Sequence, residues 1–215
     1  MNAKQTSREG KITVTRTTEE SRIRASLDPS ARRKDLKKGI RTPLQFFNHM
    51  LETLSWRACV NVEADVELTD YRLTHVICED TGITLGEAFE ELHSRAVPKG
   101  VNGAGSAVCC IDEALARCVV SFEGRPLLTL SPKLAKATAP VEDMQASDLV
   151  GFLEGFVQGA RLTLHADLIR GTNPHHVWES VFRALGDALR AAFEPCPWRS
   201  GAETGVKGKV RLEKD

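Results

Sequence analysis

Two histidine–glutamate pairs combine residue types and a spacing that suit metal chemistry. His175 and Glu179 stand in the segment NPHHVWE, and His75 and Glu79 stand in THVICE, with the members of each pair four positions apart. On a helix, residues at i and i+4 share one face, so each pair directs an imidazole and a carboxylate at one point. The sequence therefore predicts two similar helix starts that can bind a ligand.

The two copies differ at one position, and further histidines lie near them. His176 adds a candidate ligand to the later copy, whereas Val76 stands at the matching place in the earlier one. His165 lies on the predicted strand that leads into the later copy, and we expect it to reach the same site; His49 lies on an earlier predicted helix. Imidazoles and carboxylates without thiolates suit Mn, Fe, Co or Zn. The alternative is that these histidines cap helices or lie on the surface, as we expect for His93.

The hydrophobic periodicity predicts the elements that must position these residues. Alternation of apolar and polar residues predicts strands at 11–17, 22–27, 58–68, 106–111, 115–122 and 161–169. Helical periodicity predicts helices at 44–56, 75–93, 149–160 and 175–193. Thr42 is the expected N-cap of the first helix, with Pro43 at its first position. The stretches 28–42 and 131–147 are predicted to be polar loops.

The two halves of the chain share one order of predicted elements. Each has two strands, a helix, a strand, a turn and a long helix, and the two histidine–glutamate pairs are offset by 100 residues. This internal repeat predicts an α+β fold made of two duplicated halves, with helices packed on one face of each sheet. The predicted limits are 1–96 for the first half, 97–195 for the second and 196–215 for a C-terminal tail.

The composition gives no sign of a nucleic-acid or membrane partner. The chain of 215 residues is 41% hydrophobic, and its 29 Lys and Arg residues balance 29 Asp and Glu residues, so no strong field favours nucleic acid or an acidic membrane. No apolar run is long enough to span a bilayer, and the first ten residues lack a segment of the signal-peptide kind, so we expect a cytoplasmic location. The six cysteines form no C-x-x-C pair and are expected to be buried and reduced. The glycine-rich stretch 97–105 lacks the strand and helix context of a phosphate-binding loop.

A series of motifs resembles one enzyme family in content and order. The motifs are NHML at 48–51, HxxxEDxGIxLG at 75–86, DEALAR at 112–117, GRP at 124–126, LTLH at 162–165, GxNxHHxxE at 171–179 and KG at 207–208. In this order they resemble imidazoleglycerol-phosphate dehydratase, an enzyme of histidine biosynthesis. The resemblance covers nearly the whole chain.

The resemblance implies a fold, a reaction and an assembly. The family fold is a tandem pair of βαβ-type halves like domain 2 of ribosomal protein S5. The implied reaction removes water from imidazole glycerol phosphate and gives imidazole acetol phosphate. Two manganese ions per site would supply Lewis-acid stabilisation. The implied assembly is a shell of 24 subunits with active sites at the subunit interfaces, and the implied partner is a small phosphorylated imidazole.

The resemblance also assigns roles to residues of this chain. The implied metal ligands are His49, His75, Glu79, His165, His175, His176 and Glu179. The implied catalytic residues are Glu20, which matches an acidic residue of the family site, together with His49, Glu79 and Glu179. The residues expected to hold the substrate and its phosphate are Arg125, Lys207 and Arg183.

Some positions depart from the family pattern. Val76 replaces a family histidine, so one metal is expected to lose a protein ligand and to be absent, weakly held or completed by water. Gly103 replaces an arginine that contacts phosphate, a serine near Lys207 is missing, and Arg57 stands where the family has a histidine. Three interpretations follow: an active but divergent dehydratase, a non-catalytic homologue that keeps one metal for structural reasons, or a metal enzyme with another substrate.

Overall fold

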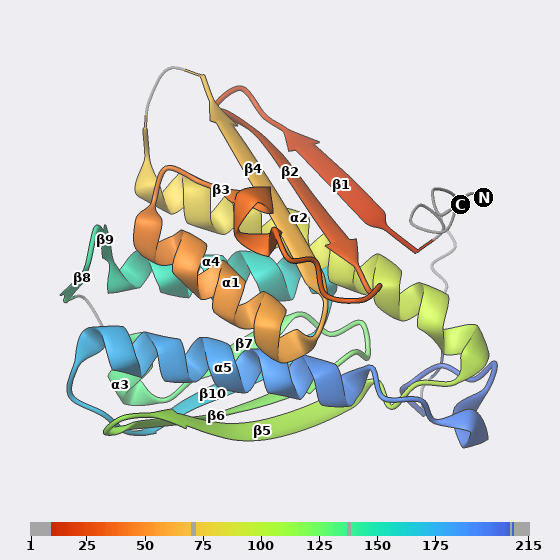
Figure 1. The fold of residues 1–215 in the computed structure, drawn as a ribbon. Coiled ribbons are helices and arrows are strands. Elements are labelled where there is room, and N and C mark those ends of the chain that lie inside the picture. Colours follow the sequence, from red (N-terminus) through yellow and green to blue (C-terminus); the bar gives the residue numbers. More distant parts are fainter. Residues whose placement is uncertain (1–9, 70–71, 137–138, 207, 209–215) are drawn as a thin grey trace, which may run out of the picture.

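The computed structural model describes residues 10–69, 72–136, 139–206 and 208. These residues form two four-stranded sheets, with a layer of long helices between them (Figure 1). Each sheet therefore has one face covered by helices, as the sequence predicts for an α+β fold. Among the described helices, none is long and apolar enough to cross a membrane.

The first sheet belongs to the N-terminal half. Its strands are β1 (Ile12–Thr17), β2 (Ser21–Asp28), β3 (Ile40–Arg41) and β4 (Asn61–Leu68), in the order β1-β2-β4-β3. Strands β1, β2 and β4 pair antiparallel, and β3 pairs parallel to β4.

The second sheet repeats this arrangement. Its strands are β5 (Ala104–Ile111), β6 (Ala114–Ser121), β7 (Leu127–Leu130) and β10 (Thr163–Arg170), in the order β5-β6-β10-β7. Again the last neighbour is parallel, because β7 runs with β10, while the other two pairs are antiparallel. The shared strand order confirms the duplicated fold.

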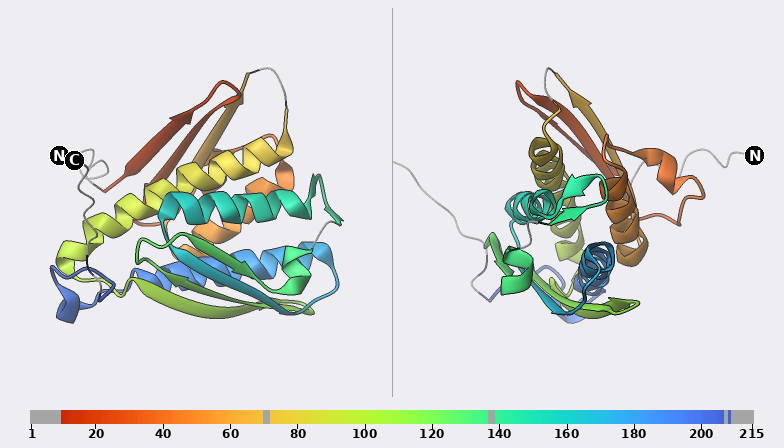
Figure 2. Two further views of the ribbon diagram at one scale, coloured as in Figure 1. Left: turned by 180° about the vertical axis from the view of Figure 1, so that it is seen from behind. Right: turned by 90° about the vertical axis from the view of Figure 1, so that its left-hand side faces the viewer.

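Four long helices fill the layer between the sheets. They are α1 (Gln45–Ala58), α2 (Thr74–Ala96), α4 (Ala146–Ala160) and α5 (Pro174–Ala192). Helix α2 packs along α4, and α1 packs along α5, so each helix pair joins the two halves (Figures 1 and 2). The largest fully buried side chains include Trp178, Phe47, Phe89, Phe152, Phe156 and Phe182.

Glycines explain how α2 and α4 pack so closely. A Cβ on Gly82 would lie 2.3 Å from the carbonyl oxygen of Phe152, and a Cβ on Gly159 would lie 2.1 Å from that of Ile83. Glycine lowers the helix propensity of α4. Here it lets the two backbones touch, so the packing between the helices offsets the poor propensity.

The structure corrects the two predicted loops. The stretch 28–42 contains a 3₁₀ helix, η1 (Leu36–Gly39), and strand β3. The stretch 131–147 contains a short helix, α3 (Pro132–Ala135), and a hairpin of β8 (Pro140–Val141) and β9 (Met144–Gln145). Strand β7 (Leu127–Leu130) is likewise not predicted by the hydrophobic pattern. These elements are only two to four residues long, so local periodicity does not reveal them. The remaining 3₁₀ helices are η2 (Val97–Lys99) and η3 (Pro197–Arg199).

The predicted cap of α1 is wrong. Leu44 is the N-cap, and its side chain makes no capping hydrogen bond. The hydroxyl of Thr42 instead accepts a hydrogen bond from the amide of Leu44 at 3.2 Å. The free amides of Gln45 and Phe46 donate to the carboxylate of Asp143, at 2.6 and 3.0 Å. The cap thus comes from the β8–β9 hairpin of the other half.

Two expectations about side-chain exposure also change. His93 is only 8% exposed and its ring stacks on Phe122, with centroids 4.7 Å apart, so it is not a solvated surface residue; burial lowers its pKa. Cys78, Cys109 and Cys118 are buried free thiols as predicted, and burial raises the pKa of Cys109 to about 12. The other three are not buried: Cys59, Cys110 and Cys196.

Candidate metal centre

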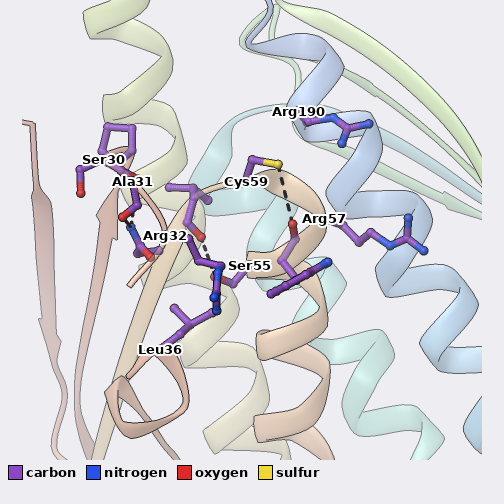
Figure 3. A pocket seen from close by; sticks show the side chains of 12 residues that line it. Ser30, Ala31, Arg32, Leu36, Ser55, Arg57, Cys59 and Arg190 are labelled. Atoms are coloured by element: carbon purple, nitrogen blue, oxygen red, sulfur yellow. Dashed lines mark hydrogen bonds between the residues drawn. The ribbon is translucent and has the colours of Figure 1, made fainter. Parts of the chain in front are cut away.

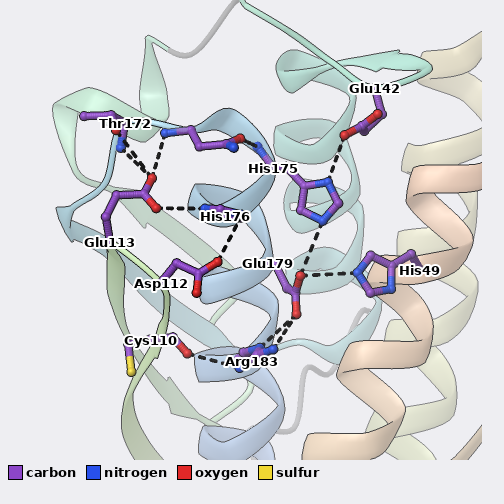
Figure 4. A network of polar contacts seen from close by, with 11 residues as sticks. His49, Cys110, Asp112, Glu113, Glu142, Thr172, His175, His176, Glu179 and Arg183 are labelled. Carbon is purple, nitrogen blue, oxygen red and sulfur yellow. Dashed lines mark hydrogen bonds and ion pairs between the residues drawn. The ribbon is translucent and has the colours of Figure 1, made fainter.

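Three side chains converge where α1 meets α5. His49 lies on α1, and His175 and Glu179 lie on the first turns of α5; one ligand atom from each lies within 4.8 Å of the others. The Nε2 atoms of both imidazoles face the same carboxylate oxygen, Oε2 of Glu179, at 3.3 Å from His49 and 3.4 Å from His175 (Figure 4). We call these three residues the His–Glu cluster.

Local sequence explains why α5 presents its two members together. Asn173 is the N-cap, and its side-chain oxygen accepts the amide of His175 at 2.9 Å, while Pro174 occupies the first turn. The helix then carries Glu179 one turn beyond His175 on the same face. Gly186 lets α1 approach, because a Cβ there would lie 2.9 Å from the carbonyl oxygen of Leu54. The close approach of the two helices brings α1 alongside the α5 face that carries the cluster.

Arg183 stabilises the ionised form of the Glu179 carboxyl group. Its guanidinium donates two hydrogen bonds to Oε1 of Glu179, from Nε at 3.0 Å and from Nη2 at 2.6 Å, and the Glu179 side chain is only 7% exposed. Burial alone would raise the pKa of Glu179, but the hydrogen bonds from Arg183 and His49 bring it below its ordinary value. Glu179 is therefore ionised at neutral pH, with Oε2 directed at the imidazoles.

The donor set fits a divalent metal ion. Two imidazole nitrogens and one carboxylate oxygen, without a thiolate, suit Mn, Fe or Zn. The Nδ1 atom of His175 lies 2.9 Å from Oε1 of Glu142, which leaves Nε2 of His175 free to face the cluster. Such an outer carboxylate is the usual partner of a metal-binding histidine.

His176 turns away from the cluster. Its Nδ1 lies 2.8 Å from Oε2 of Glu113, and its Nε2 lies 3.3 Å from Oδ2 of Asp112. The hydrogen bond to Glu113 raises the pKa of His176. Hydrogen bonds from the amide of Asn173 and from His176 lower the pKa of Glu113 to about 2. Since neighbouring residues on a helix point in different directions, His175 and His176 serve different groups.

The other expected ligands lie apart from the cluster within one chain. His75 and Glu79 are exposed on the first turns of α2, and His165 is exposed on β10. Val76, by contrast, is only 8% exposed. Among the described residues, the group with ligand atoms within 4.8 Å contains none of His75, Glu79, His165 and His176.

Two of the expected residues outside the cluster, Glu20 and Arg125, lie on the surface. Glu20 is exposed in the β1–β2 turn, where its carbonyl oxygen accepts the amide of Thr69 at 3.1 Å. Arg125 is exposed in the turn after β6, and its carbonyl oxygen accepts the hydroxyl of Thr163 at 2.9 Å. Of the two expected phosphate residues that the structure describes, Arg183 lies at the cluster and Arg125 does not. Lys207 lies outside the described residues.

Gly103 stands where the resemblance implies an arginine, and the backbone there is closely packed. Gly103 has φ +68°, and a Cβ there would lie 2.1 Å from Cγ2 of Thr204. The hydroxyl of Thr204 donates to the carbonyl oxygen of Phe122. The C-terminal segment thus packs directly over position 103, and a long side chain there would displace it.

A groove of about 420 Å³ opens beside the cluster. His49, Glu179 and Arg183 form one part of its wall, and Lys37 and Arg57 add positive charge to the rest. Of the three members of the cluster, His49 and Glu179 line this groove. It can admit a small anionic molecule next to the ligand atoms.

A second cavity shares Trp56 and Arg57 with the groove. It has a volume of about 470 Å³ and is lined by Arg32, Arg57 and Arg190 (Figure 3). Both Arg57 and Arg190 pair with Asp187, at 3.3 Å, and Arg32 lies over the ring of Trp56 at 5.2 Å. Its cations are therefore already engaged, and no member of the His–Glu cluster lines it.

Sequence reasoning missed the acidic partners of the histidines. Glu142 lies in a stretch predicted to be a loop, and no spacing rule connects it to His175. Glu113 stands inside the DEALAR motif, so the motif marked its position without revealing its contact with His176.

A duplicated α+β fold with a His–Glu cluster between its halves defines a class of protein suited to hold a metal ion. The model of the imidazoleglycerol-phosphate dehydratase family matches residues 42–189. The chain belongs to the imidazoleglycerol-phosphate dehydratase family.

Individual relatives match over nearly the full length. The imidazoleglycerol-phosphate dehydratase of Acidovorax sp. (strain JS42) is 38% identical over 201 residues, which cover 92% of this chain and 90% of the relative. That of Azotobacter vinelandii is 36% identical over 197 residues, covering 91% and 95%. The crystal structure of the Pyrococcus furiosus protein in complex with (S)-C348 has a TM-score of 0.74 at 28% identity, covering 91% of this chain and 99% of that one. The Staphylococcus aureus protein has a TM-score of 0.71 at 29% identity, covering 86% and 100%.

Proposed function

We propose that the protein is a metal-dependent dehydratase of histidine biosynthesis that removes water from imidazole glycerol phosphate to give imidazole acetol phosphate. The observation that carries the proposal is the His–Glu cluster, which lies inside the region matched by the family. The groove beside the cluster is large enough for a small phosphorylated imidazole.

We propose manganese as the ion, with His49, His175 and Glu179 as ligands from one chain. When bound, the ion supplies Lewis-acid stabilisation of negative charge. The ionised Glu179 neutralises part of the ion's charge, and Arg183 holds that carboxylate in place. The second function of Arg183, as a phosphate ligand, remains a prediction together with those of Arg125 and Lys207.

The remaining expected ligands support a site shared between subunits. His75, Glu79 and His165 are exposed and lie outside the cluster of their own chain, so they are free to meet another copy. We propose that an assembly of the family type, a shell of 24 subunits, brings them together with the cluster. In such a site Glu20 and Glu79 would be the carboxylates that take up or deliver a proton.

One combined measurement tests the function. The purified protein would be analysed for manganese per chain and assayed for formation of imidazole acetol phosphate. We expect turnover that a chelator abolishes and added Mn²⁺ restores. Bound metal without turnover at any Mn²⁺ concentration would favour the non-catalytic homologue, which the buried Val76 at a family ligand position motivates.

A further inference from the structure

The turn between β8 and β9 contains a backbone conformation that its residue does not favour. Glu142 and Asp143 form the two-residue loop between the paired residues Val141 and Met144. Glu142 has φ +50°, a left-handed conformation in which glycine is the favoured residue. A glutamate kept in this conformation at a turn indicates that its side chain has a task.

The side chain of Glu142 reaches the His–Glu cluster from outside. Its Oε1 lies 2.9 Å from Nδ1 of His175, and Nε2 of the same ring lies 3.4 Å from Oε2 of Glu179 (Figure 4). The imidazole is therefore held between two carboxylates. A hydrogen bond from Nδ1–H to Glu142 selects the tautomer whose Nε2 lone pair faces the cluster.

The rest of the turn anchors Glu142 to the helix that supplies the third ligand. The neighbouring Asp143 accepts hydrogen bonds from the amides of Gln45 and Phe46 at the start of α1, four and three residues before His49. The ring of Phe46 lies against that of His175, with centroids 4.9 Å apart. The turn thus contacts both helices whose side chains form the cluster.

We propose that Glu142 is a positioning residue for metal binding, which orients the His175 ring so that its Nε2 binds the ion held by His49 and Glu179. The inference rests on the metal-dependent function proposed above. Glu142 itself does not ligate the ion; it acts through His175. Outer partners of metal-binding histidines commonly change metal affinity by about 10- to 100-fold when removed.

The substitution Glu142→Gly separates positioning from folding. Glycine relieves the strain at φ +50° and removes the carboxylate. Titration of the metal-free full-length protein with Mn²⁺ should therefore show an affinity about 10-fold weaker than that of the wild type. The melting temperature of the metal-free variant should be unchanged or higher, so a loss of affinity cannot arise from misfolding.

Two further variants complete the test. Cys59→Gly relieves a similar conformation, φ +55°, at the far end of α1, and should leave Mn²⁺ affinity unchanged. Glu142→Gln keeps an oxygen that can accept the hydrogen bond from Nδ1, and should retain more affinity than Glu142→Gly. Positioning would be overturned if Glu142→Gly bound Mn²⁺ as tightly as the wild type. It would also be overturned if Glu142→Gln bound Mn²⁺ no more tightly than Glu142→Gly. Either result would leave the proposed function intact. A wild type that binds no Mn²⁺ would overturn both.

Discussion

At Glu179, the two carboxylate oxygens have separate partners. Oε1 accepts both hydrogen bonds from Arg183, and Oε2 faces His49 and His175. One oxygen is thus fixed by a guanidinium, and the other is aimed at the imidazoles. This division allows a nearly buried carboxylate to stay ionised and to offer one oxygen to an ion.

Replacing Arg183 tests this arrangement. In Arg183→Met the fork is lost, so burial dominates and the pKa of Glu179 rises. We expect Mn²⁺ affinity to fall about 10-fold at neutral pH, and further in mildly acidic buffer, as measured by titration of the metal-free protein. Arg190→Met is the matched control, because Arg190 lies on the same helix but pairs with Asp187. A similar loss in both variants would contradict a specific role for Arg183.

The site could be predicted from the sequence only in part. The i, i+4 spacing correctly paired His175 with Glu179, because a single helix fixes that geometry. His49 reaches the cluster because α1 packs against α5. The family resemblance predicted His49 as a ligand, whereas the local sequence pattern alone could not. His176 stays a predicted metal ligand, and within the single chain its ring faces Glu113.

The His176–Glu113 pair predicts a window of stability in pH. The pKa of Glu113 falls from 4.5 to about 2, so its contribution is present above pH 4.5 and is lost as the pH falls towards 2. The pKa of His176 is raised from 6.5, so its contribution is present below pH 6.5 and is lost as the pH rises through the raised value. The pair is therefore strongest between these limits.

Melting temperatures of the metal-free wild type and Glu113→Gln, measured across pH, check this window. The difference between the two should be largest from about pH 4.5 to 6.5 and should shrink on both sides. Glu67→Gln is the control, because the partner of Glu67 is Arg22, which does not titrate near neutral pH. The amides of Thr172 and Asn173 also donate to Glu113, so part of the difference should remain in alkaline buffer. A Glu113→Gln difference that does not decrease as the pH rises above 6.5 would contradict the involvement of His176.

At the scale of elements, the hairpin β8–β9 caps a helix of the other half. Asp143→Ala removes the acceptor of the amides of Gln45 and Phe46 and should lower the free energy of unfolding by about 1 kcal/mol. Urea denaturation of the metal-free protein measures the change. Asp35→Ala, which removes an exposed carboxylate paired with Arg33, should cost less. Equal costs would mean that Asp143 acts only as a surface charge.

Helix α4 offers two glycines with opposite expected effects. In Gly159→Ala the new methyl group would meet the carbonyl oxygen of Ile83 at 2.1 Å, so the helices must separate, at a cost of about 1–3 kcal/mol. In Gly151→Ala the new methyl group meets nothing within 4 Å, and the better helix propensity should stabilise the protein by about 0.5–1 kcal/mol. Thermal unfolding of both variants should give shifts of opposite sign; shifts of the same sign would refute the close-packing account.

These elements also show which parts of the fold the sequence specifies. The long helices and the antiparallel strands carry strong periodicity, so they were predicted with ends close to those observed. The parallel strands β3 and β7 were missed because they are only two and four residues long, too short to show a period of two. The cap of α1 was missed for another reason, since Asp143 follows Gln45 by almost half the chain.

At the scale of the molecule, each half contributes one histidine–glutamate pair, but only one pair meets the cluster. His175 and Glu179 meet His49 from the other half, whereas His75 and Glu79 lie exposed on α2. The two pairs occupy the same place in their halves, at the start of the last helix. The first pair is joined by His49, and the second pair is exposed and has no such partner in a cluster of ligand atoms among the described residues. This arrangement suits a metal site that a second copy of the chain completes.

Subunit mixing tests such sharing directly. We expect His49→Asn and His75→Asn each to abolish turnover when assembled alone. If each site takes His49 from one subunit and His75 from another, unfolding and co-refolding the two variants in equal amounts should restore about one quarter of wild-type turnover, because half of the subunits at each position are intact. If both residues serve the same site from a single chain, every site in the mixture lacks one of them and no turnover returns. Mixing two batches of His49→Asn provides the control, since no arrangement of that variant restores the missing imidazole.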